Sequence, residues 1–178
     1  MTESAAFFRI DAIGIGFLAV SPHPAHSGDA AMMIREFATG EVQQVISLLE
    51  QAEAIELGLE KEAALVNEQS MEFLSFPIPD LGLPESVIDF AGLSYKLFHQ
   101  VESGINTLIH CRAGIGRSGL LAASILLHGG RSVQQAFAQV SQMRGRQVPE
   151  TEQQGEWLLA NQSLITTMDD SMSGSSNR

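Results

Sequence analysis

The chain has 178 residues, of which 44% are hydrophobic and 17% charged, so it can bury a sizeable core and is too apolar for a disordered protein. Its formal net charge of -11, from 21 acidic and 10 basic residues, argues against general binding to nucleic acid or to anionic membranes. A single cysteine excludes an intramolecular disulfide and fits a reducing cytoplasm, and no apolar run approaches the roughly 20 residues of a membrane span.

The first part of the chain predicts strands that alternate with helices. Residues 7–20 are apolar and β-branched, with glycines between, which predicts two short strands in a hairpin. A turn-rich stretch then leads to a helix at about 30–38, with Asp29 as its N-cap and Gly40 beyond its end. Residues 42–49 are typical of a buried strand, and an acidic, helix-prone segment follows them.

The middle of the chain continues this alternation. Residues 71–76 predict a strand that ends in the proline-rich loop PIPDLGLP. Pro84 and Glu85 suit the first turn of a helix, because the residues after them are apolar at three- and four-residue steps. Residues 106–111 then predict a short buried strand, and the sequence LLAASILL predicts a helix that is buried on all sides.

Two capping patterns predict the starts of the last two helices. They are Ser132 with Gln135, before a helix to about residue 144, and Thr151 with Gln154, before a helix to about residue 167.

The order of these elements predicts an α/β fold with a central, mainly parallel sheet of four to five strands flanked by helices. We expect residues 1–168 to form a single domain and the polar residues 169–178 to be disordered.

The only cysteine lies in the stretch HCRAGIGRSG, residues 110–119, between the short strand and the buried helix. Glycines let successive backbone N–H groups point inward, and the helix N-terminus adds partial positive charge, so the loop can hold a tetrahedral oxyanion. Arg117 can fold back to grip two oxygens of the same anion. These surroundings also favour the thiolate form of Cys111. The pattern predicts attack on phosphorus and a phosphocysteine intermediate, with Arg117 and the loop amides stabilising the transition state.

Neighbouring side chains have expected supporting roles. Ser118 is placed to hydrogen-bond the thiolate and to assist its departure, whereas His110 faces the other way along the strand and is expected to order the loop. Each feature alone has a structural explanation, since buried cysteines are commonly inert, glycine turns are common, and Arg117 alone reads as a surface charge. Their combination favours the catalytic interpretation.

The stretch HCRAGIGRS carries the HCx5R[S/T] signature and resembles the cysteine-dependent protein tyrosine phosphatase superfamily. The resemblance implies that Cys111 is the nucleophile and that Arg117 clamps the phosphoryl group in the transition state. The phosphate-binding loop that it implies consists of Arg112, Ala113, Gly114, Ile115, Gly116 and Arg117.

A proton donor is needed for the leaving group, and Asp80 is the candidate. It follows a predicted strand in a proline-stiffened loop, 31 residues before Cys111. The stretch FPIPDLGLP resembles the acid loop of kinase-associated phosphatases within the dual-specificity branch. The structural alternative is a turn residue that hydrogen-bonds its own backbone.

Gln154 resembles, by its position after the signature helix, a glutamine that places the hydrolytic water in larger tyrosine phosphatases. The alternatives are that Gln154 only completes the capping pattern with Thr151, or that the adjacent Gln153 has this role.

The resemblance implies a small, dual-specificity-like protein phosphatase that needs no metal or other cofactor. Its expected partner is a phosphorylated protein, with phosphotyrosine favoured over phosphoserine and phosphothreonine. Ala113 and Ile115 stand where lipid phosphatases carry lysines, and His23 and His26 lack the further ligands of a metal site. A small phosphorylated metabolite, a phosphoprotein-binding module without turnover, and other thiolate chemistry such as sulfur transfer are the alternatives. The oligomeric state stays open.

Overall fold

A five-stranded sheet forms the centre of residues 6–169, which are the residues that the computed structural model describes. Its strand order is β1-β2-β5-β3-β4, with β1 antiparallel to β2 and all other neighbours parallel. The strands are β1 (Phe8–Ile13), β2 (Gly16–Ser21), β3 (Gln44–Ser47), β4 (Glu72–Ser75) and β5 (Thr107–His110). The predicted α/β fold with a mainly parallel sheet is therefore confirmed.

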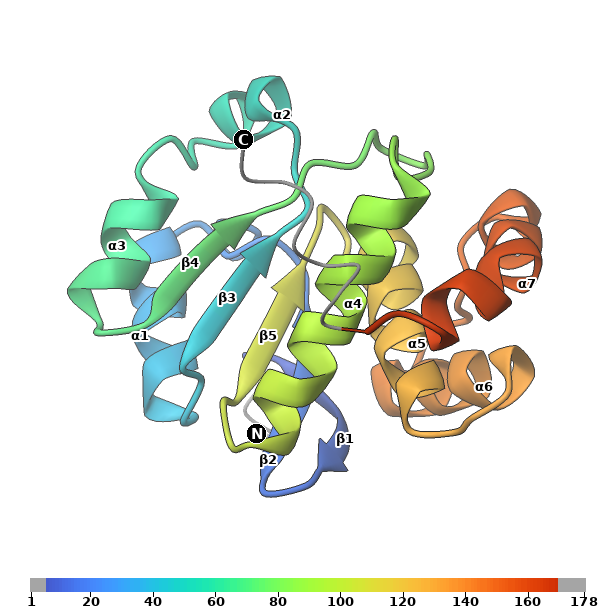
Figure 1. Cartoon of the computed structure of the whole chain (residues 1–178). Coiled ribbons are helices and arrows are strands. Elements are labelled where there is room, and N and C mark those ends of the chain that lie inside the picture. The colour runs from blue at the N-terminus through green and yellow to red at the C-terminus, as the bar shows by residue number, and fades with distance from the viewer. Residues whose placement is uncertain (1–5, 170–178) are drawn as a thin grey trace, which may run out of the picture.

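Helices cover both faces of this sheet (Figure 1). They are α1 (Ala30–Thr39), α2 (Gln51–Glu56), α3 (Glu62–Glu68), α4 (Val87–Glu102), α5 (Gly116–His128), α6 (Val133–Arg144) and α7 (Glu152–Thr166). One apolar cluster packs between the sheet and α1 with α3, and a larger one packs between the sheet and α4 to α7. Strands β2 and β5 are buried along their whole length because both of their faces are covered.

Helix α5 is the central element of the larger layer, since it contacts α4, α6 and α7. Residues 116–127 of this helix are all buried, which explains a sequence that is apolar on every side. Helix α5 begins six residues after β5 ends. The N-terminus of α5 and the carboxyl ends of β3, β4 and β5 therefore lie at one edge of the sheet, and the loops at that edge carry the candidate site (Figure 1).

Most expected elements are present, with differences at their ends. The buried strand expected at 42–49 is the shorter β3, and the acidic segment after it forms two short helices, α2 and α3, separated by a turn at Gly58. The placement of Pro84 and Glu85 in the first turn of a helix was wrong: α4 starts at Val87. Ser86 is the N-cap, because its hydroxyl accepts a hydrogen bond from the backbone N–H of Asp89.

The capping box of Ser132 and Gln135 is confirmed, as is the N-cap at Asp29. The predicted disordered tail falls almost entirely on residues 170–178, which lie outside the described residues. Within residues 6–169, no helix is both long enough and apolar enough to cross a membrane.

Candidate active site

Contacts with the end of β2 and with α6 fix the loop after β5. Gly114 has a φ of 68°, and a Cβ at this position would come within 2.4 Å of the Ser21 carbonyl, so the loop lies directly against the end of β2. Arg144 of α6 donates from Nε to the Gly114 carbonyl at 2.9 Å and from Nη2 to the Ala113 carbonyl at 3.0 Å. The loop conformation is therefore held by contacts from two other elements.

Cys111 lies at the bottom of this loop and is 3% exposed. Its Sγ is 3.3 Å from the Oγ of Ser118, which is fully buried in the first turn of α5. The structure thus brings the predicted nucleophile and its predicted hydrogen-bonding partner together at the N-terminus of a buried helix, where the helix dipole favours an anion.

Arg117 is almost fully buried, and its guanidinium contacts both α2 and the loop after β4. Its Nη1 donates to Glu53 Oε2 at 2.8 Å and to the Ile78 carbonyl at 2.9 Å, and its Nη2 donates to Glu53 Oε1 at 2.8 Å. The same Nη2 donates to Asp80 Oδ1 at 2.9 Å. The alternative interpretation treated Arg117 as a surface charge. The structure shows it buried and paired with both carboxylate oxygens of Glu53.

Charges in the site act on one another through these contacts. Burial alone would lower the pKa of Arg117, but its hydrogen bond to Glu53 and the charges of Cys111, Glu53 and Asp80 raise it above the ordinary value. The hydrogen bond from Arg117 lowers the pKa of Glu53, although burial opposes the shift. Both members of the pair are consequently charged at neutral pH.

Asp80 is half-exposed and lies at the mouth of the loop, close to Arg117. Its Oδ1 also accepts a hydrogen bond from the Leu81 backbone N–H at 3.0 Å, as the structural alternative expected. Leu81 has a left-handed φ of 57°, and its side chain is exposed. Asp80 therefore accepts the turn hydrogen bond from the Leu81 backbone and also lies beside Arg117.

His110 faces away from the loop interior, as the sequence predicted. It is fully buried, with Nδ1 at 3.3 Å from the Cys111 carbonyl oxygen and Nε2 at 2.5 Å from Glu62 Oε1. His23 reaches the same region, where its backbone N–H donates to the Arg112 carbonyl. Among the described residues, no group of three or more His, Cys, Asp or Glu side chains is arranged to hold a metal ion.

Gln154 is fully buried beside the loop. Its Nε2 donates to the Gly82 carbonyl at 3.4 Å, and its Oε1 has no hydrogen-bond partner in the described part of the chain. A Cβ at Gly116 would lie 3.2 Å from that Nε2, which places the amide beside the start of α5. Thr151 accepts from the Gln154 backbone, but the Gln154 side chain points inward, so only half of the expected capping pattern forms. Gln153 is exposed.

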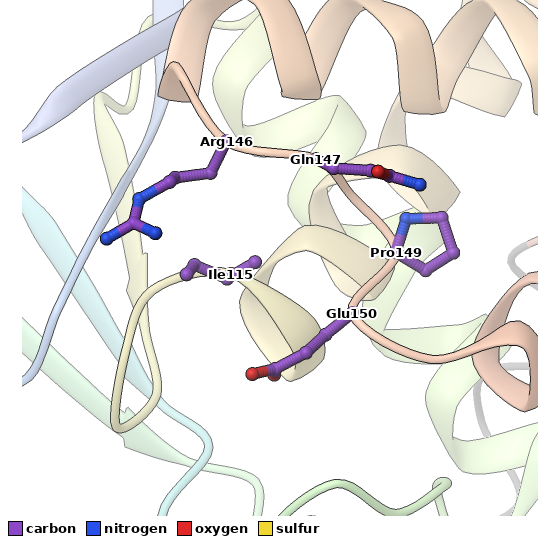
Figure 2. Close-up of a pocket in the computed structure, with 5 residues that line it drawn as sticks. All are labelled: Ile115, Arg146, Gln147, Pro149 and Glu150. Carbon is purple, nitrogen blue, oxygen red and sulfur yellow. The ribbon is translucent and has the colours of Figure 1, made fainter.

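A pocket of about 320 Å³ opens beside the loop (Figure 2). Ile115 forms one side, and the segment between α6 and α7 forms the other. The residues on that segment are Arg146, Gln147, Pro149 and Glu150. Glu150 is directed toward the start of α5, since a Cβ at Gly116 would lie 2.4 Å from its Oε2.

Sequence reasoning missed three residues that hold the site together: Glu53, Glu62 and Arg144. The two glutamates lie in an acidic stretch in which several others are exposed, so residue type does not single them out. A weak indication was present for Glu62, which shares a helical face with the buried residues Leu59 and Val66.

Residues 21–131 match a family described as a polymorphic toxin system DSP-PTPase phosphatase. The chain belongs to this family. The match runs from the end of β2 to just beyond α5 and therefore includes Asp80 and the whole loop from Cys111 to Arg117.

Two named relatives and two solved structures are also similar to this chain. A protein named as a tyrosine phosphatase, 197R of Invertebrate iridescent virus 6, is 40% identical over 75 residues, which cover 39% of this chain and 28% of that protein. Cyclin-dependent kinase inhibitor 3 of Sus scrofa is 36% identical over 84 residues, which cover 46% of this chain and 39% of that protein. The matched stretch thus spans less than half the length of each relative.

The two solved structures cover nearly the whole chain. Kinase associated phosphatase, with its catalytic-site cysteine substituted by serine, aligns with a TM-score of 0.79 at 20% identity and covers 92% of this chain and 96% of the other. Tk-PTP in its active form aligns with a TM-score of 0.73 at 27% identity, and the alignment covers 92% of this chain and 99% of Tk-PTP. The similarity to kinase associated phosphatase, at 20% identity, shows only a shared fold. The similarity to Tk-PTP, at 27% identity, agrees with the family assignment.

Proposed function

We propose that this chain is a cysteine-dependent phosphatase that hydrolyses phosphate monoesters through a phosphocysteine intermediate on Cys111. The observation that carries the proposal is the convergence of Cys111, Arg117 and Asp80 at one edge of the sheet, with the Arg117 guanidinium 2.9 Å from the Asp80 carboxylate. No metal or other cofactor takes part in this mechanism, because the loop amides, the helix N-terminus and Arg117 supply the positive potential that the phosphoryl group needs.

In the first step, the Cys111 thiolate attacks phosphorus and the bond from phosphorus to the ester oxygen breaks. The phosphoryl oxygens accept hydrogen bonds from the backbone of residues 112–117 and from Arg117. Arg117 turns from Asp80 to the substrate, while its contacts to Glu53 keep it in place. Asp80, in its protonated form, gives its proton to the departing oxygen.

In the second step, water attacks the phosphocysteine. Asp80, now a carboxylate, takes a proton from that water while the bond between phosphorus and sulfur breaks. Ser118 donates its hydroxyl hydrogen to the departing thiolate, for which the distance of 3.3 Å between Oγ and Sγ is suitable. Gln154 supports this step: its unpaired, buried Oε1 beside the start of α5 is an acceptor for a water molecule in the loop.

We propose a phosphorylated protein as the substrate, with phosphotyrosine favoured. The pocket beside Ile115 receives the groups that flank the phosphorylated side chain, since it adjoins the loop and carries both charged and apolar surface (Figure 2). Arg146 and Glu150 lie on that surface and are both exposed, so they are available to polar groups of a peptide. The names of the two relatives agree with a protein substrate.

The test is hydrolysis of p-nitrophenyl phosphate from pH 5 to 8 without added metal. We expect turnover by the wild type and by Asp89→Asn, a control variant at an exposed aspartate of α4. Cys111→Ser and Arg117→Ala should abolish turnover, and Asp80→Asn should weaken it and remove one limb of the pH profile. If folded wild type binds phosphate without turnover, the loop is a phosphoprotein-binding module instead. If Asp80→Asn retains full activity, Asp80 is not the general acid; turnover of a persulfide donor without phosphatase activity would favour sulfur transfer instead.

A further inference from the structure

Glu62 is a buried carboxylate that the proposed mechanism does not use. It lies in the first turn of α3 and is 3% exposed, and its Oε1 is 2.5 Å from the Nε2 of the fully buried His110. A buried carboxylate is costly to desolvate, so one that contacts a single residue of the signature indicates a role for that contact.

The two contacts of His110 determine how its ring is oriented. The carbonyl oxygen of Cys111 can only accept, so the hydrogen bond from Nδ1 requires a proton on Nδ1. The contact of Nε2 with Glu62 Oε1 holds the opposite side of the ring and so keeps Nδ1 directed at that carbonyl.

This pair has a defined orientation relative to Cys111. Because Nδ1 faces the Cys111 carbonyl and Nε2 faces Glu62, the ring lies between the carboxylate and the cysteine. The hydrogen bond from Nδ1 is therefore directed at the backbone of Cys111, and Glu62 holds the ring in that orientation.

The charged and titratable groups around His110 are Glu62 of α3, His23 of the segment after β2, and Cys111 and Arg112 of the loop. Burial, and next the charge of His110, lowers the pKa of His23.

We propose that Glu62 is a positioning residue: through His110 it holds the Nδ1–H hydrogen bond toward the Cys111 carbonyl and so fixes the backbone that carries the thiolate. This inference rests on the proposed role of Cys111 as the nucleophile. Glu62 itself touches neither the phosphate-binding loop interior nor any group that reacts.

The first experiment compares Glu62→Gln with Glu68→Gln, an exposed position on the same helix. Alkylation of Cys111 by iodoacetamide is measured against pH, because its rate follows the thiolate fraction. We expect the midpoint of the curve to rise by about one pH unit in Glu62→Gln, so that the thiolate fraction, and with it kcat/KM, falls about tenfold on the acid side. Glu62→Asp should restore part of the shift, and Glu68→Gln should leave the midpoint in place.

A second variant separates positioning from packing. In a His110→Asn background, Glu62→Gln should leave the alkylation midpoint unchanged, because Glu62 acts through the imidazole. A lower melting temperature with an unchanged midpoint in the single variant would show that the pair is structural and would overturn the proposal.

Ring nitrogen NMR of the wild type, labelled with ¹⁵N-histidine, provides a test that needs no variant. We expect His110 to carry a proton on Nδ1, and a ring protonated on Nε2 alone would overturn the proposal. Alkylation and NMR need no turnover. Failure of the phosphatase assay therefore counts against the proposed function, whereas failure of these two measurements counts against the role of Glu62.

Discussion

Arg117 meets two carboxylates, and the two differ in burial and in the elements that carry them. Glu53 is 8% exposed, lies in the short helix α2 and accepts two hydrogen bonds of 2.8 Å. Asp80 is half-exposed, lies in a loop stiffened by prolines and accepts one of 2.9 Å. The buried contact fixes the guanidinium, since breaking it leaves a charge away from water. In the proposed mechanism the exposed contact exchanges for a phosphoryl group at little cost, because water solvates the released carboxylate. One arginine thus has a permanent and a replaceable partner.

The largest effect should come from removing the group that both carboxylates share. Arg117→Lys keeps the charge but loses the planar fork that holds Glu53 and the phosphoryl group together. We expect kcat to fall by about 10² to 10³, as for the loss of one oxyanion donor, with a smaller change in KM. The measurement is steady-state hydrolysis of an aryl phosphate, with Arg35→Lys on the exposed face of α1 as the control. Equal losses in the two variants would argue against a specific role for Arg117.

Substitution of the two carboxylates should separate stability from activity: Glu53→Gln should mainly lower stability, and Asp80→Asn should mainly lower activity. Glu53→Gln should lower the free energy of unfolding by about 3 kcal/mol, since it leaves Arg117 buried with fewer acceptors. Asp80→Asn should leave that free energy nearly unchanged and lower kcat by about 10² or more, as for a general acid. Urea unfolding and turnover, measured on both variants, test this contrast. Similar stability losses in the two would remove the distinction between a permanent and a replaceable partner.

The pH dependence of stability separates the buried pair from a second buried group. Because the folded-state pKa of Glu53 is lowered, the Arg117 pair stabilises the protein fully above the ordinary carboxyl value of 4.5 and loses that contribution as pH falls through the lower folded value. Burial lowers the pKa of His128 from 6.5 to about 4, with His99 as a second cause. The unfolded chain therefore takes up the proton first, and stability is lost as pH falls from 6.5 toward 4.

We expect His128→Gln to flatten the wild-type decline between pH 6.5 and 4. The difference between wild type and Glu53→Gln should persist down to about pH 4.5 and shrink below that value. Chemical unfolding at half-unit pH steps measures both curves. A Glu53→Gln difference that disappears above pH 5 would contradict the assignment of this carboxylate to a tight pair with Arg117.

The position of Cys111 in its loop was predictable from the sequence because residues 111–117 are contiguous and form a single turn between a strand and a helix. The placement of Asp80 beside Arg117 was also expected, since prolines mark its loop, whereas the catalytic roles of these residues stay predictions. Glu53 and Glu62 were not predictable, because each reaches the site across the sheet edge from a separate short helix. Their burial depends on how α2 and α3 pack, and composition alone predicts an acidic solvated face there. Ser86 shows the same limit at a smaller scale, because its hydroxyl caps α4 and the helix starts three residues after Pro84.

The smallest expected effect concerns Leu81, the residue that follows the replaceable carboxylate. Its left-handed φ of 57° costs a side-chain-bearing residue roughly 1 kcal/mol or more, and its exposed side chain recovers little of that by packing. Leu81→Gly removes this strain but gives the unfolded chain more freedom, so the net gain in stability should stay below about 1 kcal/mol. Leu83→Gly, at a position without positive φ, should instead destabilise the protein. If the strained turn also holds Asp80 toward Arg117, Leu81→Gly lowers kcat a few-fold while raising the melting temperature, because the carboxylate then samples positions away from the leaving group. A variant that is less stable than wild type would contradict the strain at Leu81. A variant that is more stable and equally active would show that the turn contributes nothing to the placement of Asp80.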